Sequence, residues 1–150
     1  MIFITVQEII DDHAEIIRQY GGLGGIRDLG LLASAIDMPK STMFGEDLHP
    51  TIFDKAAAYL FHIVCNHPFI DGNKRTGTMA ALTFLRQNYL HLQFTDEQAS
   101  ILEELVVSTA QGTTTKKQIA DFFSSCYTSP NVIEEKSAQK PLKKRKSRKK

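Results

Sequence analysis

Capping signals that precede apolar stripes are the feature that most constrains the fold of this chain. Thr5 and Thr95 are each followed three residues later by Glu or Gln, the pattern of a capping box, and Thr51 has an aspartate at the same offset. After each threonine, apolar residues recur at the spacing of one helix face. The sequence therefore predicts a helix beginning close to each of these threonines.

Three more helices are predicted from similar evidence. One follows Asp28 and ends before Pro39, one runs from about Asn73 to Asn88, and the last covers roughly 116–127. Only residues 1–4 and 90–94 are typical of short strands, and neither βαβ alternation nor an internal repeat is present. We therefore expect an all-α fold in which residues 37–50 form an irregular loop.

The stripes also predict which side chains enter the core. The inward positions are Ile9, Ile10, His13, Ile16, Ile17 and Tyr20; Leu29, Leu32, Ala33 and Ile36; Ala56, Ala57, Leu60, Phe61, Ile63 and Val64; Ala80, Ala81, Phe84 and Leu85; Ile101, Leu102, Leu105 and Val106; and Ile119, Phe122, Phe123 and Cys126. We expect His13 to be a partly buried histidine with its hydrogen bonds satisfied. Tyr59, Phe61 and Phe84 are interpreted as core residues rather than a platform for a base, and His49 and His91 as loop residues.

Length and composition are those of one domain with a hydrophobic core. The chain has 150 residues, and no apolar run in it approaches the ~18 residues of a membrane span. Its first residues lack the basic and apolar regions of a secretory signal. Cys65 and Cys126 lie in apolar helical contexts without Cys-x-x-Cys spacing, so both are expected to be buried, reduced thiols. We expect a cytoplasmic protein that does not enter a membrane.

The charge is divided unevenly along the chain. Residues 1–133 hold 9 Lys and Arg against 15 Asp and Glu, whereas residues 134–150 hold 9 Lys and Arg against 2 Glu. We therefore expect a catalytic domain over residues 1–130 and a disordered basic tail over 131–150, which has too few apolar groups to fold. Three interpretations of the tail stay open: a solvated solubility tail, attachment to nucleic acid or ribosomes, and a nuclear localisation signal at 141–146. The third matters only if the protein enters a eukaryotic cell.

The chemistry is concentrated in residues 67–77, which read His-Pro-Phe-Ile-Asp-Gly-Asn-Lys-Arg-Thr-Gly between two predicted helices. The start of a helix presents free N–H groups and partial positive charge, so it suits an anion. His67 is the natural proton acceptor, and Asp71 is a hard oxygen ligand suited to Mg²⁺. Phe69 alternates with the polar groups and is expected to anchor the loop in the core.

The remaining polar groups of this segment suit a phosphate. Gly72 lets the main chain approach an anion closely, and the side chain of Asn73 can donate to it. Lys74 and Arg75 supply positive charge to phosphate oxygens. A solvated surface turn is the simpler explanation for any one of these residues. Six suited groups at one loop-to-helix junction favour a functional site.

The same segment resembles the Fic/Doc motif, His-x-Phe-x-(Asp/Glu)-(Gly/Ala)-Asn-x-Arg. Residues 9–28, which include Tyr-Gly-Gly-Leu and Gly-Ile-Arg-Asp, are similar to the N-terminal signature of the Doc branch, the death-on-curing toxins, and residues 31–39 continue it. The resemblance covers about residues 1–127. It implies a Fic/Doc-type helical bundle that transfers part of ATP to a protein hydroxyl.

Two departures from the Fic pattern bear on which part of ATP is transferred. Lys74 stands where AMP-transferring Fic proteins carry glycine, and Thr78 stands where they usually carry a second arginine. The resemblance to Doc implies transfer of the γ-phosphate instead, with translation elongation factor Tu as the target and an arrest of translation as the result. AMP transfer is the alternative reaction. An inactive Fic scaffold that acts through its tail is the alternative of another class.

Carried over by position, the resemblance implies that His67 accepts the proton of the target hydroxyl and that Asp71 holds Mg²⁺. Gly72 and Asn73 would cradle the phosphates, and Lys74 and Arg75 would clamp them. Self-inhibiting Fic proteins use a helix reading (Ser/Thr)-x-x-x-Glu-(Gly/Asn), to which Ser100 and Glu104, followed by leucine, are only a near match. A separate antitoxin is therefore the implied partner. Gly21–Gly25 is interpreted as a flexible helix connection near the target-binding flap.

Overall fold

The computed structural model describes residues 1–127. Within them the chain forms six α-helices, which are α1 (Val6–Tyr20), α2 (Leu29–Asp37), α3 (Ile52–Asn66), α4 (Asn73–Gln87), α5 (Asp96–Ala110) and α6 (Lys116–Cys126). The all-α prediction is confirmed, with helix ends within a few residues of those expected. None of these helices has the length and apolar character needed to cross a membrane. The predicted domain boundary at residue 130 and the tail lie outside the described residues.

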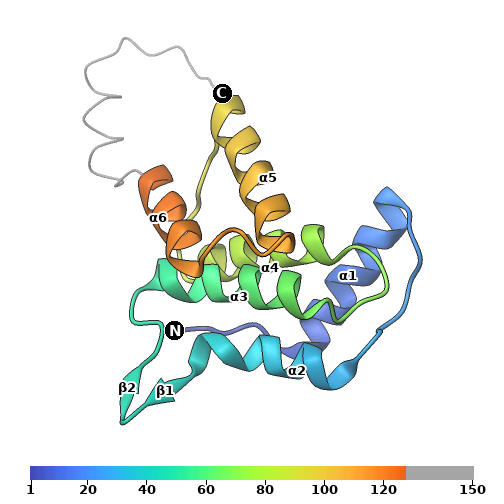
Figure 1. Cartoon of the computed structure of the whole chain (residues 1–150), viewed down its shortest axis with the longest axis horizontal. Coiled ribbons are helices and arrows are strands. Elements are labelled where there is room, and N and C mark those ends of the chain that lie inside the picture. The colour runs from blue at the N-terminus through green and yellow to red at the C-terminus, as the bar shows by residue number, and fades with distance from the viewer. Residues whose placement is uncertain (128–150) are drawn as a thin grey trace.

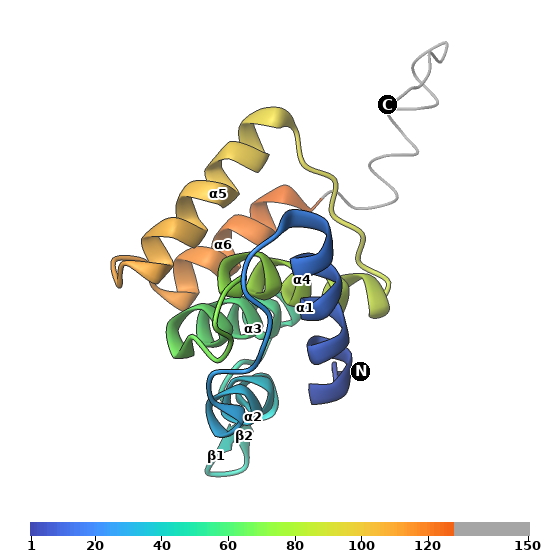
Figure 2. The same ribbon diagram turned by 90° about the vertical axis from the view of Figure 1, so that its right-hand side faces the viewer.

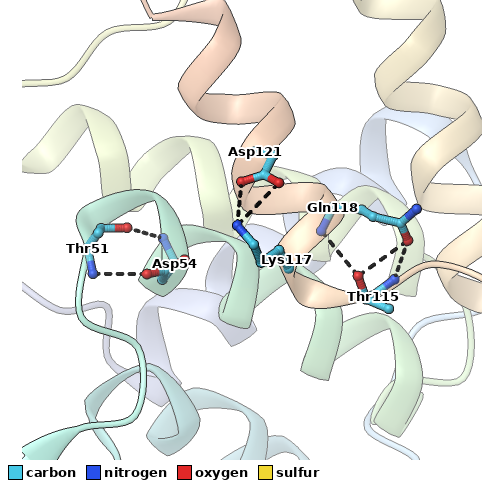
Figure 3. Close-up of polar contacts among 6 residues, drawn as sticks. All are labelled: Thr51, Asp54, Thr115, Lys117, Gln118 and Asp121. Carbon is cyan, nitrogen blue, oxygen red and sulfur yellow. Dashed lines mark hydrogen bonds and ion pairs between the residues drawn. The ribbon is translucent and has the colours of Figure 1, made fainter.

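Side-chain caps begin most of the helices, as the sequence predicts. Complete capping boxes are present at Thr5 with Glu8, Thr51 with Asp54, and Thr95 with Gln98. A further box, between Thr115 and Gln118, begins α6 and was not predicted (Figure 3). Figure 3 also shows the exposed ion pair of Lys117 with Asp121 one turn later, at 3.1 Å between Nζ and Oδ1.

Helix α3 lies at the centre of the fold and contacts α2, α4, α5 and α6. In Figure 1 it crosses the middle of the molecule, with α2 below it and α5 above. Helix α1 lies beside α4, as Figure 2 shows. The largest side chains of the core are fully buried between these helices, and they include Tyr59, Phe69, Phe84 and Phe123.

The close packing of α3 on α4 depends on a glycine. A Cβ atom at Gly77 would lie 2.9 Å from Cγ2 of Val64 and 3.1 Å from the main-chain oxygen of Leu60. The first distance is shorter than real Cβ contacts, and the second is tighter than nearly all of them and involves a main-chain atom, so a larger residue would push the two helices apart. Since α3 and α4 flank residues 67–72, this packing also sets where that loop lies.

The predicted strands were wrong. Residues 1–4 and 90–94 do not pair with any strand in the described part of the chain. In the first segment side chains bond the main chain instead: Tyr59 Oη accepts from the Ile4 N–H at 3.0 Å, and the Asn88 amide pairs with the N–H and C=O of Ile2. The expected irregular loop 37–50 instead contains a 3₁₀ turn (Met38–Lys40) and a small hairpin of β1 (Thr42–Met43) with β2 (Glu46–Asp47).

Several burial predictions were also wrong. Leu29 is 58% exposed, because it is the first residue of α2 and follows a segment, 21–28, that is exposed throughout. Ile101 is 39% exposed, since α5 is buried only along the narrow stripe of Leu102, Val106 and Thr109. Cys126 is buried as expected, but Cys65, in the last turn of α3, is exposed.

A cluster of cationic and imidazole groups lies where α6 begins beside α3. His49 lies in a loop, as expected. Lys116 Nζ lies 2.9 Å from Nε2 of His49 and 3.0 Å from Nε2 of His62, which the sequence did not predict. Burial, and then the charges of Lys116 and His49, lower the pKa of His62 to about 4. Burial, and then Lys116 and Lys55, lower the pKa of His49, while Asp54 acts in the opposite direction.

We predict that Gly77→Ala lowers the free energy of unfolding by about 1–3 kcal/mol, because the overpacking outweighs the better helix propensity of alanine. Urea unfolding followed by circular dichroism measures the change. Gly24→Ala is the matched control, since a Cβ there meets no atom within 4 Å. A Gly77→Ala protein as stable as the control would contradict the packing argument.

We predict that acid destabilises the protein through His62. Its pKa is about 4 in the folded chain against the ordinary 6.5, so between these values the unfolded chain binds a proton that the folded chain does not. The stability from this group is fully present above pH 6.5 and is lost as the pH falls towards 4. In thermal melts, His62→Gln should therefore lose less Tm between pH 7 and pH 5 than the original protein, and His91→Gln should not differ from it. Equal losses in all three proteins would contradict this assignment.

Candidate functional site

The candidate site is the loop 67–72, which joins the end of α3 to the start of α4. His67 follows the last residue of α3 in the left-handed conformation, with φ 52° and ψ 54°, which few residues other than glycine adopt. Arg27 holds it there from another part of the chain. The Arg27 guanidinium donates from Nε to the oxygen of His67 at 2.6 Å and from Nη2 to that of Asn66 at 2.9 Å. It thereby satisfies carbonyls that the end of a helix leaves free.

The segment between α1 and α2 is fastened along one side of this loop. The N–H groups of Arg27 and Asp28 both donate to Pro68 O, at 2.7 and 3.0 Å, and the Ile70 N–H donates to Gly25 O at 3.1 Å. Ile26 and Phe69 form an isolated antiparallel bridge. In Figures 1 and 2 the blue connection after α1 passes beside the green turn after α3. The glycine-rich connection predicted to be flexible is thus partly paired with the site.

Phe69 and Asn73 hold the loop from its buried side. Phe69 is fully buried, as its alternation with polar residues predicted. The Asn73 side chain is also buried: its Oδ1 accepts from the Phe69 N–H and its Nδ2 donates to the Phe69 oxygen, both at 3.0 Å. Both halves of this amide are therefore used on the main chain. The pair uses only one of the two N–H donors of Nδ2, so donation from the Asn73 side chain to an anion stays a prediction, beside the main-chain N–H of the same residue.

Helix α4 begins without a side-chain cap. Its first position is preceded by Gly72 in the left-handed conformation, with φ 81° and ψ 14°. The first main-chain donor with a partner of the helical type is Thr76 N–H, which bonds Gly72 O at 2.9 Å. The N–H groups of residues 73–75 thus precede the first helical bond, and a left-handed residue followed by helical ones forms a concave anion-binding nest.

The charged residues of the site surround this helix start. Asp71 is exposed, and its Oδ2 accepts from the Leu23 N–H at 2.8 Å, whereas its Oδ1 has no hydrogen bond to residues 1–127. Lys74 is exposed. The Arg75 guanidinium lies over the ring of Tyr20, 4.2 Å from its centroid, so the ring orients this cation at the end of α1. Tyr20 was expected in the core but is 60% exposed.

A groove of about 1110 Å³ extends from the site between α4 and α5. Its basic side carries Lys74, Arg75 and Arg86, and its acidic side carries Glu103 and Glu104. Leu82, Leu102 and Val106 are among its apolar lining. Glu104, the glutamate of the near match to the inhibitory helix, therefore lines the same groove as the two cations of the motif.

The structure brings together the predicted residues 67–75 and adds others that sequence reasoning missed. Arg27 and the main-chain groups of Leu23 and Gly25 support the loop, and Tyr20 supports Arg75. Their only sequence signal was the resemblance of residues 9–28 to the Doc signature. His13 was predicted to be satisfied and partly buried, and it is: its Nε2 lies 2.7 Å from the oxygen of Asp71.

Comparison with known proteins decides the family. The model of the Fic/DOC family matches residues 3–85. The chain belongs to the Fic/DOC family. A protein named Toxin Doc from Mycolicibacterium smegmatis is 47% identical over 73 residues, which are 49% of this chain and 56% of that toxin. A protein named Protein kinase doc from Escherichia phage P1 is 33% identical over 127 residues, which are 85% of this chain and 97% of that kinase. Both relatives place the chain on the Doc branch.

We predict that Asn73→Ala frees the loop of this Doc-branch protein. It removes both partners of the Phe69 main chain, so hydrogen exchange at the Phe69 amide should become at least ~10-fold faster and the free energy of unfolding should fall by about 1–3 kcal/mol. Asn88→Ala is the matched control, since Asn88 pairs with both main-chain groups of Ile2 in the same way. Equal Phe69 exchange in the two variants would show that Asn73 does not hold the loop.

Proposed function

We propose that this protein is a Doc-type protein kinase that transfers the γ-phosphate of ATP to a protein hydroxyl. The observation that carries the proposal is the start of α4, which combines Gly72 in the left-handed conformation, no side-chain cap, and adjacent Lys74 and Arg75. Such a helix start binds phosphate through main-chain N–H groups and partial positive charge. The loop that leads into it carries an exposed imidazole and an exposed carboxylate.

His67 is proposed to be the general base. Its ring is exposed, and Arg27 holds its main chain from behind. A neutral imidazole can take the proton of a hydroxyl as that oxygen attacks the γ-phosphorus. The bond from the γ-phosphorus to the bridging oxygen then breaks, and ADP leaves with that oxygen. Positioning and charge stabilisation supply most of the rate in such a transfer.

Asp71 is proposed to be the ligand of Mg²⁺. Among residues 1–127 no group of three or more His, Cys, Asp or Glu side chains forms a metal site. A single carboxylate oxygen nevertheless fits this cation, because Mg²⁺ keeps several waters and takes phosphate oxygens as its other ligands. The Leu23 N–H holds the second oxygen of Asp71 and fixes the direction of the first. When bound, Mg²⁺ would offset the negative charge of the phosphates.

Lys74 and Thr78 favour phosphate transfer over AMP transfer. Lys74 adds bulk and positive charge at a position where AMP-transferring Fic proteins have glycine. The hydroxyl of Thr78 donates to the Lys74 oxygen at 2.9 Å, so it supplies no second cation for a phosphate tail. The phage P1 relative, which aligns with 85% of this chain, is named a protein kinase, and its name supports the same choice.

Membership of the Doc branch also guides our proposal for the target and the partner. We propose elongation factor Tu as the protein substrate, an arrest of translation as the effect, and a cognate antitoxin as the inhibitor. Toxin Doc of M. smegmatis, 47% identical over the aligned residues, is named a toxin, which supports an antitoxin partner. The basic tail would add contact with nucleic acid.

We predict that ATP carrying one label on the γ-phosphate and another on adenine passes only the γ-label to elongation factor Tu. His67→Ala should reduce this transfer by at least ~10³-fold without lowering Tm, since it removes the base from an exposed position. His91→Ala, which removes another exposed histidine, should keep full activity. Transfer of the adenine label would instead establish AMP transfer. Full activity in the His67 variant would overturn the mechanism.

We predict that Lys74→Gly changes which part of ATP is transferred. Without the bulk and charge of lysine, the phosphate tail can pass this position, so γ-phosphate transfer should fall and transfer of the adenine label should rise. Lys117→Gly is the control, because it makes the same substitution at another exposed lysine in a helix far from the motif. Unchanged transfer in the Lys74 variant would show that this position does not decide the reaction.

A further inference from the structure

His13 lies directly beneath the candidate site, although it is on a different helix. It comes from the middle of α1 and is 4% exposed. Its Nε2 is 2.7 Å from the main-chain oxygen of Asp71. Its ring is stacked on that of Phe69, with centroids 3.7 Å apart and an angle of 8° between the planes. These contacts leave the imidazole little freedom to turn.

The contact with Asp71 determines which ring nitrogen carries the proton. A carbonyl oxygen only accepts hydrogen bonds, so Nε2 of His13 must be the donor. The stack on Phe69 keeps the ring plane in the direction that aims this donor at Asp71 O. His13 is thus a directed donor buried under the loop.

The hydrogen bond from His13 to Asp71 O also fixes the direction of the Gly72 N–H, which belongs to the same peptide unit. In a trans peptide the C=O of one residue and the N–H of the next point in opposite directions. With the oxygen of Asp71 turned towards α1, the N–H of Gly72 must point away from it. That N–H precedes the three free N–H groups at the start of α4 and belongs to the same nest.

This peptide has particular need of such a restraint. Glycine accepts positive and negative φ almost equally, so the bond between Asp71 and Gly72 can turn over without a steric penalty from a side chain. Space is also restricted: a Cβ at Gly72 would lie 3.2 Å from Cδ1 of Ile17 and 3.5 Å from Cδ2 and Nε2 of His13. A larger residue in place of Gly72 would restrict the main chain but would press against α1. The hydrogen bond from His13 to Asp71 O supplies the restraint instead.

We infer that His13 is a positioning residue, which sets the direction of the Gly72 N–H and so assembles the phosphate-binding nest at the start of α4. It touches neither substrate nor reacting atoms, and it acts through the peptide of Asp71 and Gly72. The inference rests on the proposed function, in which this nest holds the phosphates of ATP.

Two substitutions separate the hydrogen bond from simple packing. His13→Gln places an amide donor four bonds from Cα, the same number as Nε2 of histidine, and so retains the donor. His13→Leu keeps apolar bulk against Phe69 but has no donor. Ile9→Ala is the control for general loss of stability, because Ile9 is fully buried in the hydrophobic core one turn earlier on α1 and its side chain has no hydrogen-bond donor to lose. His13→Asn, whose amide is one bond shorter, replaces the leucine variant if that one does not fold.

The variants are compared in kcat and KM for ATP, in Tm, and in the ¹H–¹⁵N signal of the Gly72 amide without nucleotide. His13→Leu should lower kcat/KM roughly 10- to 100-fold, the scale for a misplaced main-chain donor, and should shift or broaden the Gly72 signal. His13→Gln should stay within about threefold of the original protein. Ile9→Ala should lose Tm with no change in kcat/KM or in the Gly72 signal.

The inference is overturned if His13→Leu and Ile9→Ala, at equal loss of Tm, have the same kcat/KM, or if His13→Gln is as impaired as His13→Leu. Failure of the proposed function appears elsewhere, as an absence of label transfer by the unaltered protein. In that case the Gly72 signal alone decides the inference: an identical signal in the unaltered protein and His13→Leu contradicts it.

Discussion

The site depends on how the chain deals with the free main-chain groups at two consecutive helix ends. The carbonyls that end α3 are satisfied by the guanidinium of Arg27, which reaches the oxygens of both Asn66 and His67. The N–H groups that begin α4 have no side-chain cap. The other five α-helices of residues 1–127 each begin with a Thr or Asp side chain that binds such a donor. The exception falls at the one place where an anion is proposed to bind.

The main chain of the same loop is held rigid by hydrogen bonds. Asn73 pairs with both main-chain groups of Phe69, the segment 25–28 pairs with Pro68 and Ile70, and His13 pairs with Asp71. These partners fix the main chain while the side chains of His67, Asp71 and Lys74 stay exposed. Such a division between a held backbone and accessible groups is what catalysis by positioning requires. Lys74 and Arg75 also place positive charge at the site, although residues 1–133 as a whole carry 9 Lys and Arg against 15 Asp and Glu.

Local signals predicted the helices well because caps and stripes act within a few residues. The caps at Thr5, Asp28, Thr51 and Thr95 all form. The burial of Leu29 and Ile101 was predicted wrongly because exposure depends on how far a neighbouring element extends, which a stripe does not encode. The strands at residues 1–4 and 90–94 were wrong for a related reason, since a strand needs a partner strand. The main chain of Ile2 and Ile4 bonds side chains instead.

The residue types of the site could be predicted from the sequence, but the contacts between them could not. The residues of the motif were identified by their types and order. The use of the Asn73 amide on Phe69, the support of His67 by Arg27, and the place of Tyr20 under Arg75 are contacts that only the fold creates. The contact of Asn73 with Phe69 was not predicted because, by sequence alone, an amide beside a glycine serves an anion or a loop backbone equally well.

The central claim is that the start of α4 holds the phosphates of ATP. A crystal structure with Mg²⁺ and a non-hydrolysable ATP analogue tests it most directly. The account predicts phosphate oxygens within hydrogen-bond distance, ~2.7–3.2 Å, of main-chain nitrogens between Gly72 and Arg75, with the γ-phosphorus facing the His67 ring. A nucleotide bound elsewhere, or with its phosphates directed away from this helix start, would contradict it.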